Sequence, residues 1–551
     1  MTSATDLAKR HGALKASRGT FESHWREVAE RVLPRQNDFL GAGQTPGAKR
    51  TDKVYDSAGE IAVNKFAAVL EALLTPQTQT WHKLKPKNPA LADNQEIGEW
   101  FDHVNDRLFD ARRSPRARFH TMAHEFYLSL GVFGTGAMFI DKAPLGPLLY
   151  KACHIGQVYF AENAWGVIDT VHREFALSAR QAVQKFDKGR LPSKVVAASE
   201  RAPDSNFTFV HCVKPNEERA QGKRDYTGMP WASYYFPLED AGNGIIEEGG
   251  YSSFPWAISR YVTAPTETYG RSPAMSALPD IKILNEAMKV THAQWHQALD
   301  PPWLVADEFM GALHARNGAV NRGGLDDQKR PNVVPLVPAS NFEVSFELTS
   351  QKRETINDIF LVRILQIILD NPQMTATQVL EIAQQKGVLL APVMGRQQSE
   401  FLGPLIEREL DLLYSAGMLP DAPEELLLHG GGYDIEYESP LALAQKAQRG
   451  VAVMRTWEAI APMAQADPAV LDEFNVPKMA REVAEANGLP ADCFNPQEQI
   501  EALAEQRAQQ QAIQAGLAGA EQGAGAMKDM AQAAKIIYDD KGRPSEVRVG
   551  G

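Results

Sequence analysis

Two pairs of histidines lie four residues apart, His120 with His124 and His292 with His296. On a helix, each pair would place both imidazoles on one face, where they could bind a metal ion. Neither pair has the His-Glu-x-x-His form, and no acidic third ligand accompanies either pair in the sequence. We therefore interpret both as helix-face histidines, which leaves a metal-dependent hydrolase as a distant alternative.

Other patterns that carry chemistry are missing from the sequence. Residues 41–49 resemble a phosphate-binding loop but lack the Gly-Lys-Ser/Thr ending that supplies its lysine and hydroxyl. There is no Gly-x-Ser-x-Gly elbow, and the carboxylates have no spacing specific to a reaction. Cys153, Cys212 and Cys493 are too few and too far apart for a disulfide framework or a structural zinc site. We expect no enzyme, no cofactor and no metal.

Clustered cations are the other candidate functional residues. They are Arg112, Arg113, Arg116 and Arg118 in one group and Lys329 with Arg330, beside two aspartates, in another. The arginine group could contact phosphate, a partner or solvent, and we favour a patch facing solvent or a subunit over nucleic acid. We interpret the second group as a solvated loop that could also contact a partner.

The charge balance and composition limit the possible functions. The 551 residues include 57 Lys and Arg against 69 Asp and Glu, a formal net charge of −12. Proteins that grip a phosphate backbone tightly are usually basic, so general nucleic-acid binding is disfavoured, although a surface that DNA slides past is compatible. The length predicts two or more folding units. The longest apolar run, residues 359–369, is too short to span a membrane, and no signal peptide is indicated.

The N-terminal part is predicted to be helical. Apolar residues seven apart between positions 7 and 32 predict one continuous helical face, which Gly12 and Gly19 weaken and Pro34 ends. A second helix ends at Thr75-Pro76. A third helix covers residues 97–108. We interpret Trp81, which follows the second helix, as part of a structural corner.

The middle of the chain is predicted to be α+β. Short β-like runs occur at residues 137–140, 157–160, 207–213 and 231–236. Ser178 and Gln181 form a capping box that opens a short helix. A long helix then ends at Asp300-Pro-Pro302, and a β-like insert, with runs at residues 332–337 and 342–348, precedes a second helix over residues 350–370.

The C-terminal part is predicted to be mostly helical. A long helical run over residues 375–417 should kink or break at Pro392 and Pro404, and further helices follow residue 440. The predicted fold class is therefore α+β and predominantly helical.

Seven strings, in their order along the chain, resemble the portal, or head-to-tail connector, proteins of short-tailed phages. They are WREVAE at residues 25–30 followed by Pro34, VYDS at 54–57, LTPQTQTWHKL at 74–84, YGRSP at 269–273, ALPDIK at 277–282 followed by Leu284 and Asn285, PP at 301–302 and MTATQV at 374–379. The resemblance covers most of the chain to about residue 465.

The resemblance implies a subunit that assembles as a ring of twelve. It implies a wing over residues 1–270, a first stem helix over 271–300, a clip over 301–349 and a second stem helix over 350–370. A channel-proximal segment with a long kinked helix over 371–440, a helical crown over 441–515 and a flexible tail or barrel segment over 516–551 would follow. Apolar residues are spread around the second stem helix, which agrees with one contact to its partner helix and another to the neighbouring subunit, although a buried core helix would show the same pattern.

The resemblance also implies a function and partners. The ring would occupy one capsid vertex in the virion, after assembly in the host cytoplasm, as a non-enzymatic conduit for packaging and ejecting double-stranded DNA. Its partners would be the terminase large subunit, a tail adaptor, and the major capsid and scaffolding proteins. Expected contacts with DNA in the channel are Lys282, Lys289, Gln373 and Arg396. The main alternative is another structural component of the capsid or tail.

Overall fold

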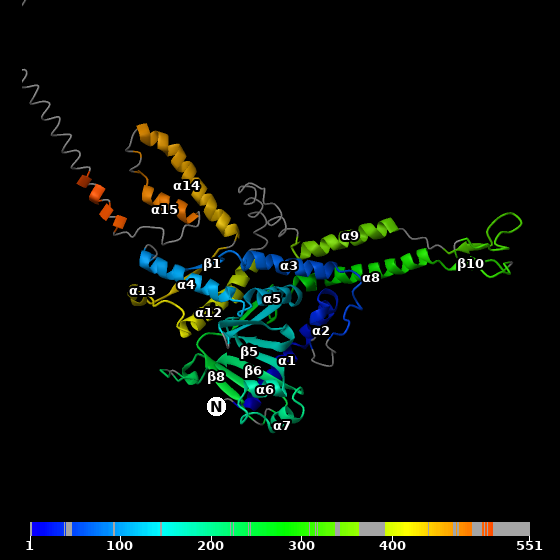
Figure 1. Cartoon of the computed structure of the whole chain (residues 1–551), viewed down its shortest axis with the longest axis horizontal. Coiled ribbons are helices and arrows are strands. Elements are labelled where there is room, and N and C mark those ends of the chain that lie inside the picture. The colour runs from blue at the N-terminus through cyan, green and yellow to red at the C-terminus, as the bar shows by residue number, and fades with distance from the viewer. Residues whose placement is uncertain are drawn as a thin grey trace, which may run out of the picture. The chain divides into compact units, whose positions relative to one another are not determined.

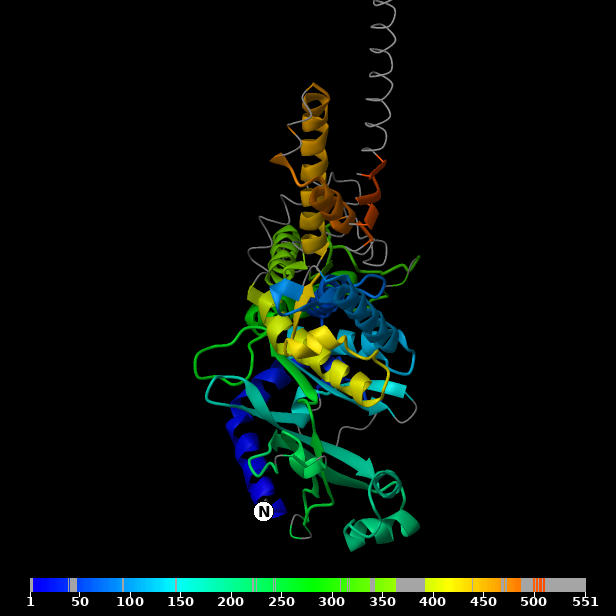
Figure 2. The same ribbon diagram turned by 90° about the vertical axis from the view of Figure 1, so that its left-hand side faces the viewer.

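The structure is a computed structural model of the chain (Figures 1 and 2). It describes residues 3–510 except 38, 40–46, 92–93, 144–145, 221, 224, 241, 243, 308, 315, 317, 337–341, 363–391, 439, 467–469, 471–472, 487–498, 501, 504 and 508. One compact unit comprises Met1–Leu84, His103–Asp421 and Asp434–Arg449, and a second comprises Lys85–Asp102, Ala422–Tyr433 and Gly450–Gly551. In the portion described, no helix has the length and apolar character needed to cross a membrane.

The N-terminal helical region is divided between α1 (Ala4–Ser17) and α2 (Gly19–Val32). The apolar face is buried as expected, with Leu7 and Trp25 almost inaccessible to solvent. The prediction of one continuous helix was wrong, because the chain breaks at Arg18. The break lies directly before Gly19, and the buried Arg18 guanidinium donates hydrogen bonds to the carbonyl oxygens of residues 155, 156 and 158.

Helices α3 (Ala58–Leu74) and α5 (Phe119–Phe133) pack against each other at a close approach. A Cβ atom on Gly131 would lie 2.8 Å from the Phe66 ring, so only glycine allows this distance. The expected end of α3 at Thr75-Pro76 is confirmed, and the Thr75 hydroxyl lies 3.3 Å from that of Tyr127. The third expected helix is α4 (Gln95–Arg113).

Antiparallel sheets form the α+β part, and the four expected β-like runs are confirmed within β2, β4, β6 and β7. One sheet has the order β3-β2-β9, from β2 (Thr135–Ala143), β3 (Gly146–Ala152) and β9 (Trp256–Arg260). Another has the order β4-β5-β6-β7-β8, from β4 (Val158–Glu162), β5 (Ile168–Ser178), β6 (Asn206–Pro215), β7 (Trp231–Pro237) and β8 (Glu247–Tyr251).

Helices cover both faces of the β4–β8 sheet. Because side chains alternate along a strand, Phe209 of β6 packs with α6 (Ala179–Lys185) and α7 (Ser193–Arg201), while Val210 packs with α1 on the opposite face. Figure 2 shows α1, in dark blue, beside this sheet. The expected capping box of Ser178 and Gln181 is confirmed at the start of α6.

A long helical hairpin projects from the first unit (Figure 1). Helix α8 (Pro273–Leu299) is capped by the Ser272 hydroxyl and ends before Asp300, as expected. Strand β10 (Trp303–Val305) then pairs with β11 (Val333–Pro335), and α9 (Phe342–Ile359) returns beside α8. We call α8, β10, β11 and α9, with the loop between the strands, the α8–α9 hairpin.

The expected strand over residues 342–348 was wrong, since these residues begin α9. Their apolar positions include 342 and 346, a spacing that suits a helix face as well as a strand. The helix places the Phe346 ring 6.4 Å from that of Trp295 on α8. The second helix thus begins at residue 342, and residues 363–370 lie outside the described part of the chain.

A continuous helical segment combines the π-helix η6 (Gln398–Leu402) and α12 (Gly403–Ser415). Pro404 stands in the first turn of α12, where the helical type has just changed from π to α, and the helix continues through it without the break that the sequence led us to expect. The remaining elements are β1 (His82–Pro86), which forms a sheet with β12 (Tyr433–Tyr437), and α13 (Glu424–Leu428), α14 (Pro440–Ala466) and α15 (Val476–Ala486). The expected tail over 516–551 lies outside the described residues.

Buried titratable groups join α1 to the β4–β8 sheet. His11 Nε2 lies 3.2 Å and Lys15 Nζ 2.9 Å from Glu174 Oε2, and the hydrogen bond from His11 is the main reason that the pKa of Glu174 falls to about 2. The His172 ring stacks on that of His11 with centroids 5.7 Å apart. Burial lowers the pKa of His172 to about 3, so this ring is neutral in the folded protein near pH 7.

We therefore predict that the free energy of unfolding falls as the pH drops from 6.5 towards 3. The unfolded state binds a proton at His172 near pH 6.5, whereas the folded state does so only near 3. Urea denaturation of His172→Gln should show a pH slope that is smaller by up to about 1.4 kcal/mol per pH unit. Parallel curves for the original protein and His172→Gln would contradict the assignment.

Candidate functional site

The α8–α9 hairpin is the candidate functional site, and polar contacts hold its base in place. The Asn285 side-chain oxygen on α8 accepts a hydrogen bond from the Asp56 backbone N–H at 3.0 Å. The Asp56 carboxylate binds Arg353 on α9 at 2.8 Å, and Lys352 binds Asp280 across the two helices at 2.7 Å. Two separate strings of the sequence, at 54–57 and 284–285, therefore meet at this base.

Along its length, the hairpin exposes large apolar side chains. On the helices they are Ile283, Val290, Trp295, Leu299, Phe346 and Leu348, and on the strands Trp303, Leu304, Val305 and Val334. Leu299 is 85% exposed. A single soluble chain rarely leaves so much apolar surface in one region. Our sequence reasoning missed this surface, although the run Trp303-Leu304-Val305 directly after Asp300-Pro-Pro302 was a usable signal.

The second stem helix was expected to make contacts through apolar residues on several sides, and the structure describes only some of these residues. Ile356 and Phe360 are buried, and the Phe360 ring lies 6.1 Å from that of Phe66 on α3. These residues therefore pack within the chain. The apolar residues from Ile364 onward lie outside the described residues.

Two of the expected DNA contacts lie on α8, and both are exposed. Lys282 Nζ binds Glu27 of α2 at 2.7 Å, so its charge is balanced within the chain. Lys289 Nζ lies 5.9 Å from the centre of the Tyr55 ring, a distance at which a cation interacts favourably with an aromatic face.

The other two expected DNA contacts lie in the C-terminal half. Arg396 donates a hydrogen bond to the Thr263 hydroxyl at 2.8 Å and lies 3.8 Å from Glu400. Gln373 is outside the described residues. The structure does not bring Arg396 into contact with Lys282 or Lys289 through any described hydrogen bond or ion pair.

Lys329 and Arg330 lie in the loop between β10 and β11 and are exposed, as expected for a solvated loop. Lys329 has a positive φ of 61°, which marks a tight turn. Arg330 binds Asp326 at 2.9 Å. This loop is the part of the α8–α9 hairpin that connects its two strands.

The expectation that Arg112 lies at the surface needs correction. Its side chain is 1% exposed, because it forms a buried ion pair with Glu409 of α12. Arg113, Arg116 and Arg118 are exposed, and Arg118 precedes α5 with a positive φ of 60°. The cationic patch is therefore formed by three of the four arginines.

The Arg112 guanidinium is fully engaged inside the protein. Its Nε lies 3.0 Å from both oxygens of Glu409, and its Nη1 lies 2.6 Å from His82 Nε2. Because arginine only donates, His82 Nε2 must accept, which agrees with a pKa held well below its usual value by burial and then by Arg112. The Tyr150 hydroxyl donates to Glu409 at 2.5 Å. Trp81, with its ring 4.5 Å from the guanidinium, packs over this cluster as a structural corner.

The histidine pairs meet different surroundings. His124 Nδ1 lies 3.0 Å and His120 Nδ1 4.0 Å from the Glu71 oxygens, so the two rings share one carboxylate on α3. His292 and His296 are exposed near the far end of α8. Within the described ranges, no group of three or more His, Cys, Asp or Glu side chains has the arrangement of a metal site.

Comparisons with known proteins agree on one family. A family model described as "Bacteriophage head to tail connecting protein" matches residues 4–494. The "Probable portal protein" of Bordetella phage BPP-1 is 29% identical over 521 residues, which is 92% of this chain and 91% of that protein. The "Portal protein" of Salmonella phage epsilon15 is 28% identical over 518 residues, 92% of each chain.

One comparison with solved structures gives a weaker likeness. A chain from "Neck of empty GTA particle computed with C6 symmetry" aligns with 72% of this chain and 86% of its own length, at 12% identity. Its TM-score of 0.36 is too low to establish a shared fold.

The ion pair of Arg112 and Glu409 leads to a stability prediction. Glu409→Gln leaves a buried guanidinium without its counter-charge and should lower the free energy of unfolding by about 3–5 kcal/mol. The double variant Arg112→Met with Glu409→Gln should recover part of this loss, because no buried charge is left unpaired. Urea denaturation measures both, and equal losses in the single and double variants would contradict the assignment.

Proposed function

The chain belongs to the family of bacteriophage head-to-tail connecting proteins, and we propose that twelve copies form the portal ring at one vertex of a phage capsid. In this proposal, DNA enters during packaging and leaves during ejection through the centre of the ring. The names of the two phage relatives support the proposal, because each is called a portal protein and matches along nearly the whole chain.

The observation that carries the proposal is the uncovered apolar surface of the α8–α9 hairpin. One face of α8 is buried within the chain through Ile281 and Leu284, while Ile283 and Val290 on the same helix are exposed. Removing apolar surface from water lowers the free energy by roughly 25 cal/mol per Å² of that surface. Adjacent copies in a ring would supply the surface that covers them.

The negative net charge of the chain supports a conduit through which DNA passes without being bound tightly. Each lysine or arginine that neutralises a phosphate adds to a salt-dependent grip, which would oppose sliding. The net charge is −12, and Glu27 balances Lys282 on α8. We assign only transient DNA contacts to Lys282, Lys289, Gln373 and Arg396.

We assign the subunit parts in the order that the resemblance implies, with one boundary moved. Residues 1–270 form the wing, α8 and α9 form the stem, and the clip is the ribbon of β10 and β11, so that the second stem helix begins at residue 342. Residues 371–440 approach the channel, and residues 441–515 form the crown. ATP hydrolysis and motion belong to the partner motor, since portal subunits are structural.

Partner proteins would bind the ring at its charged and apolar surfaces. The ribbon, with Lys329 and Arg330 in its loop, receives the terminase large subunit and later the tail adaptor. Arg113, Arg116 and Arg118 face the neighbouring subunit or the major capsid and scaffolding proteins. The ring assembles in the host cytoplasm and stays in the virion.

Ring formation can be tested with the purified full-length chain. Mass photometry and negative-stain microscopy should show rings of twelve with a central hole, and a monomer at every concentration would contradict the proposal. Leu299→Glu should raise the concentration for half-assembly at least tenfold, because it places a charge in a covered apolar seam. Its fold should be unaffected, since Leu299 is 85% exposed. Tyr226→Glu, an exposed position in a loop before β7, is the matched control.

The clip assignment can be tested by removing the ribbon alone. Leu336 N donates to the Pro302 carbonyl oxygen at 2.7 Å, so a short Gly-Ser linker can replace residues 303–335 without moving α8 or α9. The variant should still form rings but should lose binding to the terminase large subunit, measured by surface plasmon resonance on assembled rings. Unchanged motor binding would refute the assignment.

A further inference from the structure

Trp165 stands exposed at the tip of a rigid turn between β4 and β5. Its side chain is 85% exposed, so it contributes little to the core. The Asn163 side-chain oxygen accepts hydrogen bonds from the backbone N–H groups of Trp165 at 2.9 Å and Val167 at 3.1 Å. Gly166 adopts a φ of +75°, which closes the turn. The hydrogen bonds therefore hold the backbone of the turn, which presents a large apolar side chain to water.

The tip of this turn is fastened to the start of the η6–α12 helical segment. Arg260 donates to the Gly166 carbonyl oxygen at 3.4 Å and to Glu400 of η6 at 2.8 Å. It also binds Glu162 at the end of β4. Because these contacts fix the backbone before any partner arrives, little conformational entropy is lost when Trp165 binds.

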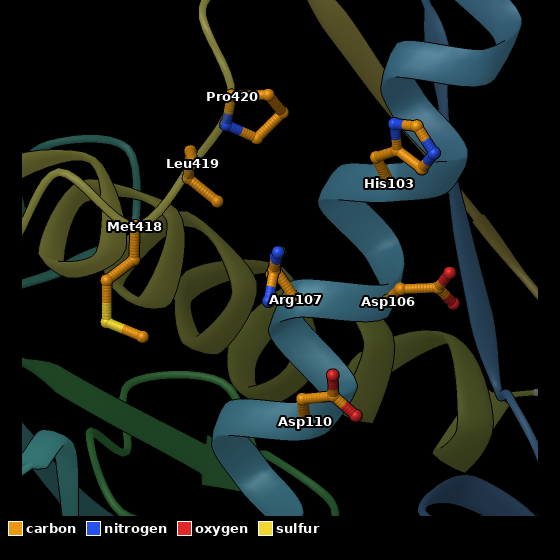
Figure 3. A pocket seen from close by; sticks show the side chains of 7 residues that line it. All are labelled: His103, Asp106, Arg107, Asp110, Met418, Leu419 and Pro420. Atoms are coloured by element: carbon orange, nitrogen blue, oxygen red, sulfur yellow. The ribbon is translucent and has the colours of Figure 1, made fainter.

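A pocket of about 510 Å³ lies beyond the other end of the same helical segment (Figure 3). It is formed by His103, Asp106, Arg107 and Asp110 of α4 and by residues 418–420, which follow α12. Figure 3 shows the α4 side chains on one side and Met418, Leu419 and Pro420 on the other. All these residues belong to the first unit.

The lining suits an aromatic ring that carries one hydrogen-bond donor. A guanidinium such as that of Arg107 interacts favourably with an aromatic face, and the sulfur of Met418 with a ring edge. Leu419 supplies apolar contact. The carboxylates of Asp106 and Asp110 could each accept the indole N–H, which needs a partner when it is buried. Indole meets all of these requirements.

The turn and the pocket lie at opposite ends of one helical segment. Glu400 contacts the arginine that holds the turn, and Met418 lines the pocket. The fifteen residues from Glu400 to Ser415, where α12 ends, rise by about 22 Å at ~1.5 Å each. The turn and the pocket are therefore well separated on one chain, and Trp165, which is 85% exposed, does not fill the pocket of its own chain. A protrusion and a receiving pocket on different parts of one subunit form a head-to-tail contact, which closes into a ring when the rotation fits.

We propose that Trp165 of one copy inserts into the pocket of the adjacent copy, between α4 and residues 418–420. The proposal rests on the proposed function, because it names a contact within the ring. It assigns a second seam between neighbours, separate from that of the α8–α9 hairpin.

The first test measures assembly of the full-length chain. Trp165→Ala should raise the concentration for half-assembly about 30-fold, as for a central interface tryptophan, and Trp165→Phe should raise it less. Leu419→Glu in the pocket should act like Trp165→Ala, and combining the two should add little. Tyr226→Ala is the control for loss of an exposed aromatic side chain. Circular dichroism and thermal melting should be unchanged in Trp165→Ala, because the side chain is exposed.

The second test is a disulfide between copies. Trp165→Cys with Leu419→Cys, in a Cys493→Ser background, should give a ladder of covalent oligomers on mild oxidation of assembled rings. Each single cysteine variant should give no ladder, since Cys153 and Cys212 are buried.

The outcomes separate this contact from ring formation itself. Rings of the original sequence, with no ladder and with normal assembly of Trp165→Ala, would overturn the contact and leave the portal proposal standing. Trp165→Ala rings that assemble normally but fail to enter capsids would also overturn the contact and leave the portal proposal standing. That result would place the tryptophan against a capsid protein. Absence of rings from the original sequence would overturn the portal proposal.

Discussion

Buried charges on the η6–α12 segment hold the first unit together. Arg408 and Glu409 are almost inaccessible to solvent, and a buried charge without a partner costs several kcal/mol. Each is matched by a residue far away in the sequence, Glu409 by Arg112 of α4 and Arg408 in part by Asp141 of β2 at 3.6 Å. Glu400 likewise binds Arg260 of β9. The segment can therefore occupy only one position relative to α4 and the β3-β2-β9 sheet.

The α8–α9 hairpin has the opposite distribution of polarity. Around the η6–α12 segment, charges such as those of Arg112 and Glu409 are buried and paired, whereas along the hairpin apolar side chains such as Leu299 and Phe346 face solvent. The chain belongs to a family that connects phage heads to tails, which offers a reason for this difference in polarity. The paired charges fix the shape of each subunit, and the exposed apolar surface would become interior only when copies assemble.

Local signals in the sequence were sufficient for many elements. Thr75-Pro76 ended α3 because the residue before a proline is disfavoured in a helix, and Ser178 with Gln181 began α6 because their side chains cap its free N–H groups. Short runs of β-branched and aromatic residues between turn residues located strands such as β6 and β7. Residues 342–348 were mistaken for a strand because their pattern also fits a helix, and contact with α8 decides between the two.

The sequence by itself determined the fold class, the order of its main elements and the likeness to portal proteins, since these depend on residues close together in the chain. Only the tertiary structure decided which individual side chains are buried and which residues they pair with. Arg112 was grouped with surface arginines because its partner, Glu409, is 297 residues away. Arg18 is buried because its guanidinium binds carbonyl oxygens near residue 156, which lie far away in the sequence. Burial and pairing depend on distances through space, which spacing along a single chain does not record.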